Sequence, residues 1–120
     1  MSQNFQAGDF LIFQIESGYG LLRLLGVDET ANGETIWHLK AYNEMFLDIE
    51  MADAALLNFQ NLTVSIPHIA LTNRAFESTQ TARMLNQPLE ESDLLSFEGW
   101  KNDENREIYD RSIRLMLGLR

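Results

Sequence analysis

An Asn-Gly pair, Asn32-Gly33, lies between two apolar-rich stretches and constrains the fold more than any other feature. Asn-Gly favours a two-residue type I′ turn, because both turn positions need a positive φ. If these two residues form the loop, Leu24 faces Ala41 across the hairpin and Arg23 faces Tyr42. The sequence therefore predicts two long antiparallel strands, one on each side of this turn.

A second tight turn, at Ser17-Gly18, predicts another strand before the first hairpin. In that register Phe13 faces Leu22 and Leu11 faces Leu24. The two turns are assigned independently, yet both hairpins place the same apolar residues on one face, and a one-residue slip in either would destroy the agreement. The shared face consists of Leu11, Phe13, Ile15, Leu22, Leu24, Trp37, Leu39 and Ala41.

The opposite face of this sheet mixes apolar and charged side chains. Such a face is too apolar to remain fully solvated. We therefore expect the sheet to curl into a small barrel or to be covered by a helix. The residues of this face are Phe10, Ile12, Leu25, Val27 and Ile36, together with Arg23, His38 and Lys40.

Beyond residue 45 the pattern predicts shorter elements. A fourth strand extends to about Glu50, and a short helix with Asp48 as its N-cap extends to about Asn58. Pro67 lacks an N–H, which indicates that its strand lies at a sheet edge or is broken there. The other predicted elements are strands at 62–71, 79–87 and 94–100, with 88–93 as a connection.

The last segment predicts a helix over about 103–118, because Asp103 can cap it and an apolar stripe runs through Ile108 and Leu115. The predicted fold class is α+β, with a strongly curved antiparallel sheet or small barrel followed by this C-terminal helix. A length of 120 residues indicates one domain. Within this domain we expect a strand meander over about 9–50 and a mixed middle over 51–100.

The chain is acidic, with 18 acidic and 9 basic side chains and a formal charge of −9. That sign disfavours nonspecific binding to nucleic acids and to anionic membranes. Residues 1–100 hold 14 acidic and 4 basic side chains, whereas residues 101–120 hold 4 and 5. We therefore expect the sheet region to present an acidic face to another protein. A basic protein would suit this face, because opposite charges attract.

Several kinds of chemistry are excluded or unsupported by the residue types. The absence of cysteine excludes disulfides, thiol catalysis and thiolate metal sites. A serine-nucleophile elbow and a phosphate-binding glycine loop are also missing. We expect no cofactor and no metal. The N-terminal residues lack the basic and apolar pattern of a signal peptide, so a cytoplasmic location is expected.

Two histidines, His38 and His68, are the main candidates for proton transfer or metal binding. Neither has a neighbouring ligand at the spacing of common metal motifs. We interpret both as polar strand positions and assign no catalytic residue. A small ligand-binding or enzymatic barrel that uses one of them with a nearby carboxylate stays as an alternative.

Five residues are candidates for a binding surface. Tyr19 lies beside glycines at a hairpin tip, and Trp100 precedes a polar stretch; tryptophan is enriched at binding hot spots. Glu90, Glu91 and Asp93 form an acidic cluster in the predicted connection. The apolar residues on the second sheet face suggest a further alternative, in which the chain is a structural subunit of an oligomer.

The pattern Gly8-Asp9-Phe10-Leu11-Ile12-Phe13, followed by Gly18-Tyr19-Gly20, resembles the opening of small immunity proteins of bacterial polymorphic toxin systems. The resemblance covers about a fifth of the chain and is loosely compatible with Trp100 near a late strand. It implies a small barrel that inhibits a toxin by binding it, and it implies no catalytic residues. Acidic inhibitors of basic nucleases use charge in this way to speed association.

Overall fold

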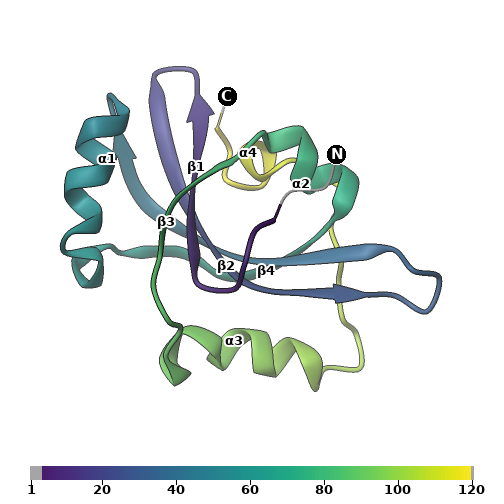
Figure 1. Cartoon of the computed structure of the whole chain (residues 1–120). Coiled ribbons are helices and arrows are strands. Elements are labelled where there is room, and N and C mark those ends of the chain that lie inside the picture. Colours follow the sequence, from purple (N-terminus) through teal and green to yellow (C-terminus); the bar gives the residue numbers. More distant parts are fainter. Residues whose placement is uncertain (1–3, 120) are drawn as a thin grey trace.

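The computed structural model describes residues 4–119 and is built on a five-stranded antiparallel sheet with the strand order β4-β3-β2-β1-β5 (Figure 1). The strands are β1 (Asp9–Ile15), β2 (Gly18–Glu29), β3 (Thr35–Phe46), β4 (Val64–Thr72) and β5 (Ala82–Asn86). The helices are α1 (Ile49–Leu56), α2 (Asn73–Thr79), α3 (Glu91–Lys101) and α4 (Ile113–Met116). The α+β class is confirmed.

The sheet is open, so the predicted small barrel or strongly curved sheet is wrong. Strands β4 and β5 form its two edges and do not pair with each other. The physical reason is visible in Figure 1, where α2 and α4 lie on one side of the sheet and α3 lies on the other. Helices of the same chain cover both faces, and the sheet need not close on itself to bury them.

The turn predicted at Ser17-Gly18 lies one residue earlier in the chain than expected. Ile15 pairs with Gly18, which leaves Glu16 and Ser17 as the loop, and Leu11 pairs with Leu22 rather than with Leu24. The side-chain faces are unchanged, because side chains alternate with a period of two and the register moves by two residues. All eight residues of the predicted shared face lie in the main core cluster or pack against it.

The Asn-Gly turn differs from the prediction in type. The amide of Gly33 donates to the Thr30 carbonyl at 2.9 Å, Thr30 in turn donates to Glu34, and Gly33 has a φ of 81°. The loop thus has three residues, and only its glycine needs a positive φ. Register shifts along the β2–β3 ladder also place Leu24 opposite Leu39 instead of Ala41.

Two core clusters form, one on each sheet face. The main cluster adds Ala75 and Phe76 of α2 and Ile113 of α4 to the residues of the sheet. The second cluster packs Ala52 and Leu56 of α1 against the opposite face. Its strand residues are Phe10, Ile12, Leu21 and Tyr42.

The middle of the chain agrees with the sequence in part. Helix α1 is confirmed, and its N-cap Asp48 accepts a hydrogen bond from the Met51 amide at 2.8 Å. Strand β4 is an edge strand, as Pro67 indicated, and β5 lies inside the predicted strand at 79–87. The predicted fourth strand to about Glu50 is wrong, because Met45 and Phe46 are the last residues of β3 and α1 starts at Ile49. Helix α2 was not predicted.

Two predictions in the last third are wrong. Residues 94–100 belong to helix α3 rather than to a strand. The predicted helix at 103–118 is reduced to α4, which starts after its N-cap Ser112. In the segment before α4, the Tyr109 amide donates to the Ala70 carbonyl, and the Tyr109 carbonyl accepts from the Thr72 amide. Backbone pairing with the edge strand β4 thus takes the place of the predicted helical hydrogen bonds. Among the helices of residues 4–119, none has both the length and the apolarity needed to cross a membrane.

Candidate functional site

The most unusual feature of the sheet is a pair of buried cations beneath α3. Arg23 of β2 and Lys40 of β3 are opposite each other in the ladder, and they are only 2% and 7% exposed. A buried charge is costly unless a partner of opposite sign and hydrogen bonds compensate it. Arg23 also lies over the rings of Phe10 and Phe59, 4.5 and 5.4 Å from their centroids.

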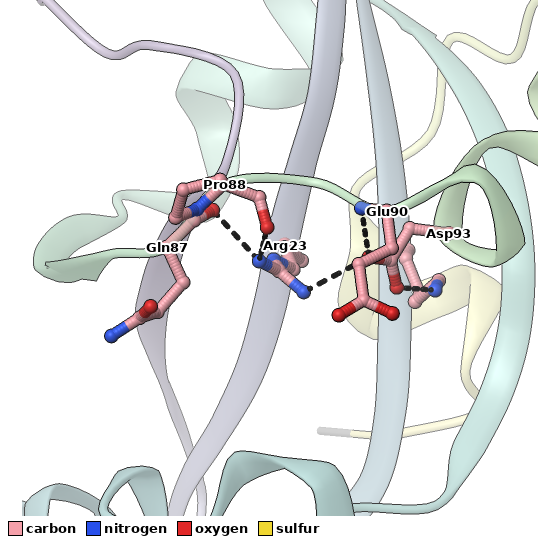
Figure 2. Close-up of polar contacts among 6 residues, drawn as sticks. Arg23, Gln87, Pro88, Glu90 and Asp93 are labelled. Carbon is pink, nitrogen blue, oxygen red and sulfur yellow. Dashed lines mark hydrogen bonds and ion pairs between the residues drawn. The ribbon is translucent and has the colours of Figure 1, made fainter.

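Asp93 of α3 supplies the compensating charge. Its carboxylate is 2.8 Å from Lys40 Nζ and 3.4 Å from Arg23 Nη1. Arg23 Nη2 donates to the carbonyl oxygens of Gln87 and Pro88 at 2.8 and 3.3 Å, so the guanidinium lies between this loop and α3 (Figure 2). The cluster joins two strands, a loop and a helix.

The same carboxylate fixes the beginning of α3. Asp93 accepts a hydrogen bond from the Glu90 amide at 2.9 Å, which satisfies one of the free N–H groups at the helix start. Burial acts to raise the pKa of Asp93, but hydrogen bonds from Lys40 and Glu90 and the nearby cations outweigh it, so the pKa is lowered. Asp93 therefore stays ionised and holds α3 on the sheet.

A pocket of about 240 Å³ opens beside this cluster. The buried residues Arg23, Lys40 and Tyr42 form its floor. Apolar side chains of the segment after α1 and of β4 form one wall, and the loop before α3 forms the other. The remaining lining residues are Phe59, Gln60, Leu62, Val64, Pro88, Glu90, Ser92 and Asp93.

The two histidines lie together on the same sheet face, next to the buried cations. His38 Nδ1 is 3.0 Å from His68 Nε2, and His38 Nε2 is 2.9 Å from the Asp28 carboxylate. A carboxylate only accepts, so His38 Nε2 carries the hydrogen, and a neutral His38 then accepts from His68. Asp28 of β2, His38 of β3 and His68 of β4 thus form one hydrogen-bonded chain across three neighbouring strands.

Helix α3 covers this chain with aromatic rings. Phe97 stacks on His38 with a centroid distance of 4.1 Å, and Trp100 meets His38 edge-on at 4.8 Å. Desolvation lowers the pKa of both histidines. The pKa of His68 falls to about 4, and the neighbouring His38 is the second cause of that shift. His38 is completely buried, so it contacts no substrate while α3 stays docked.

The structure separates the five predicted binding residues. Glu90 and Glu91 are exposed, as expected, whereas Asp93 points inward to the buried cations. Trp100 packs on the histidines, and its indole N–H donates to the Glu107 carbonyl at 2.9 Å. Tyr19 is half-buried against the second core cluster, away from the α3 residues.

Sequence reasoning missed the cluster because it treated residues 94–100 as a strand. Leu94, Phe97 and Trp100 are spaced by three, which is one side of a helix, and Asp93 lies one turn before Phe97 on that side. An acidic residue on the apolar side of a helix, together with two cations on an apolar sheet face, was the signal that could have revealed the contact.

Comparison with protein-family models, with curated proteins and with solved structures found no significant match for this chain. Within residues 4–119, no three histidine or carboxylate side chains lie close enough to hold a metal ion. The candidate site is therefore described by its own geometry: an internal polar cluster under α3, a small pocket beside it, and an acidic outer surface.

Proposed function

We propose that this protein is a non-enzymatic module that binds a basic partner protein through its acidic surface. The observation that carries the proposal is the unequal exposure of the charges. Of the fourteen acidic side chains in residues 1–100, eleven are exposed, whereas two of the four basic ones, Arg23 and Lys40, are buried. The internal cluster thus removes cations from the surface.

The two exposed bases of this region also have acidic neighbours. Arg74 forms an ion pair with Asp110, and Arg83 lies 3.8 Å from the buried Asp9. Their charges are therefore partly neutralised within the chain. A surface of one dominant sign speeds encounter with an oppositely charged protein and rejects partners of like charge.

The outer side of α3 is the part of this surface best suited to contact. It presents Glu91 and Glu98 to solvent together with Leu95, which is 68% exposed. An exposed apolar side chain between carboxylates offers both burial and charge to a partner. The inner side of the helix is fixed by Asp93 and Phe97, so this surface is held rigidly.

An immunity-type inhibitor is one concrete version of this proposal. The sequence pattern of Gly8–Phe13 and Gly18-Tyr19-Gly20 resembles the opening of such proteins, and acidity suits an inhibitor of a basic toxin. In that version the partner is a basic enzyme whose cationic active site the acidic surface covers. We propose a cytoplasmic location with it, since the toxin would act there.

Affinity capture from the native host tests the proposal. The variant Glu91→Lys/Glu98→Lys should lose a basic protein that the parent chain retains, and salt should weaken the parent's capture because it screens surface charge. Glu16→Lys/Glu104→Lys makes the same charge change at two other exposed positions and should retain the partner. Equal capture by both variants would exclude α3 as the contact.

The two alternatives fare differently. The histidines do lie beside a carboxylate, but Phe97 and Trp100 seal them, so an enzymatic role would need α3 to move.

The oligomer alternative was motivated by apolar residues on the second sheet face. Of those five residues only Val27 is exposed, at 44%, so that motivation is lost.

A further inference from the structure

The pocket beside the buried cations has more hydrogen-bond donors on its floor than the surrounding protein uses. Arg23 Nε is buried, and within residues 4–119 no atom accepts its hydrogen. Lys40 Nζ has three hydrogens, and its hydrogen bond in the described structure goes to Asp93. Arg23 Nε is itself closed off from solvent, so the remaining hydrogens of Lys40 are the ones that this floor can offer to an acceptor-rich group.

Charge points to the same kind of group. Arg23 and Lys40 together carry two positive charges, and Asp93 is the carboxylate that contacts both of them. The floor therefore keeps one positive charge in excess. Glu90 lies at the rim and is exposed to water, so its opposing effect is screened.

Tyr42 adds a donor of a different type. Its ring is 5% exposed and stacks on Phe10. Burial raises the pKa of Tyr42 to about 12, so its hydroxyl keeps its hydrogen at neutral pH. The floor thus combines an ammonium and a phenol as donors beside the positive charge of a guanidinium, a set that suits the two oxygens of a carboxylate.

The walls and the volume define the rest of the ligand. Phe59, Leu62 and Val64 provide an apolar wall next to these donors. The volume of about 240 Å³ is below the roughly 300–1,000 Å³ of pockets for drug-sized molecules. It suits a single ring or a short alkyl chain.

We propose that this pocket binds a small organic carboxylate, whose oxygens accept hydrogen bonds from Lys40 and Tyr42 beside the charge of Arg23, while its apolar body packs on Phe59, Leu62 and Val64. The ligand's carboxylate would complete the hydrogen bonding of the floor and neutralise its excess charge. This site is separate from the outer side of α3, so the inference goes beyond the proposed protein binding and does not depend on it.

The test uses the full chain and four probes, benzoate and hexanoate with their neutral analogues benzamide and hexanamide. Binding is followed by NMR through the Nε–H resonance of Arg23, assigned by its disappearance in Arg23→Lys. Both carboxylates should shift this resonance saturably. The amides should bind at least about tenfold more weakly, since a hydrogen bond to a charged group contributes about 1.5–3 kcal/mol and 1.4 kcal/mol is tenfold.

Variants locate the binding. Tyr42→Phe and Lys40→Met should each weaken benzoate binding by about tenfold or more. Arg111→Gln removes an exposed positive charge outside the pocket and should leave the affinity unchanged. Val64→Trp fills the pocket at its 43% exposed rim without altering the charged floor, and it should abolish binding even if Lys40→Met fails to fold.

Three results would overturn the inference. The first is the absence of any saturable shift with either carboxylate. The second is equal affinity for benzoate and benzamide, which would mean that the donors on the floor are not used. The third is unchanged benzoate binding in Val64→Trp, which would place the binding outside the pocket.

Discussion

Asp93 is the single residue on which the packing of α3 depends most. It neutralises Lys40 and Arg23, both nearly inaccessible to water, and it accepts from the Glu90 amide. Asp93→Ala is therefore expected to lower the free energy of unfolding by about 3 kcal/mol, because it leaves two buried cations without a counter-charge. Urea unfolding followed by circular dichroism measures the change.

Glu91→Ala is the matched control for this substitution. It removes an acidic side chain from the same first helical turn, but Glu91 is exposed. Its loss should cost less than about 1 kcal/mol, the usual contribution of a surface charge near a helix start. Equal losses in the two variants would show that the buried ion pairs contribute no more to stability than the helix dipole does.

The histidine chain makes stability depend on pH. The pKa values of His38 and His68 are lowered in the folded state, that of His68 to about 4, so the unfolded chain takes up protons first as pH falls below 6.5. Stability should therefore decrease from about pH 7 to about pH 4, by at most about 1.4 kcal/mol per pH unit for each histidine. Urea unfolding at a series of pH values tests this.

Asp93 adds a second phase at lower pH. Its pKa is also lowered by folding, so the stability that it contributes is present above the unfolded carboxyl pKa and is lost as pH falls through the folded one. His68→Phe keeps an aromatic ring against Phe97 and should flatten only the upper phase. A profile of His68→Phe that overlays the parent profile above pH 5 would contradict the assignment.

At the scale of the elements, α3 is fixed to the sheet at two points one turn apart. Asp93 provides the ionic contact and Phe97 the aromatic one; Phe97 also fits against Gly26, where an added Cβ would lie 2.9 Å from its ring. Phe97→Ala is expected to cost about 3 kcal/mol, as for other large aromatic side chains in cores.

Leu95→Ala is the comparison within the same helix. Leu95 is 68% exposed, so its truncation should change the free energy of unfolding by no more than about 0.5 kcal/mol. Hydrogen exchange in residues 91–101 should rise in Phe97→Ala and remain as in the parent in Leu95→Ala. Unchanged exchange in Phe97→Ala would show that Asp93 alone is sufficient to hold the helix.

The strands that follow a period of two could be predicted, whereas elements decided by tertiary contacts could not. The main-core face survived a register error at the Ser17-Gly18 turn, because the error was two residues. The segment around Tyr109 has an apolar helical stripe, yet its backbone pairs with Ala70 and Thr72 at the open edge of β4. The conformation around Tyr109 is set by strand residues almost forty positions earlier, and the local spacing of apolar residues does not reveal that contact.

The candidate site was predictable only as separate residues. Asp93 and Trp100 were recognised as candidates, but the sequence indicated an exposed acidic loop rather than a helix whose inner side carries both. Arg23, His38 and Lys40 were correctly placed on one sheet face, and their common cover could not be identified without the position of α3. The contact joins residues 23 and 93, a separation beyond the reach of local patterns.

At the scale of the whole molecule, the formal charge of −9 should make the folded state sensitive to salt. Self-repulsion of a compact acidic chain destabilises it, and added salt screens that repulsion. The melting temperature should therefore rise between about 10 mM and 150 mM NaCl, over which the Debye length falls from about 30 to 8 Å. Differential scanning calorimetry at constant pH measures the change.

The buried ion pairs give this experiment its control. Lys40 and Arg23 are shielded from solvent ions, so screening acts mainly on the exposed acids. Glu16→Gln/Glu104→Gln reduces the surface charge without touching the cluster and should reduce the salt response. A melting temperature that falls with salt would mean that surface ion pairs such as Arg74–Asp110 outweigh the general repulsion.

The manner in which Arg23 holds the loop before α3 has a consequence for how the sequence can diverge. The guanidinium binds the main-chain carbonyl oxygens of Gln87 and Pro88 and makes no hydrogen bond to the Gln87 side chain. A substitution at position 87 preserves the contact as long as the backbone path is kept. Among descendants of this gene, the residue at position 87 should vary, whereas Arg23 should be retained.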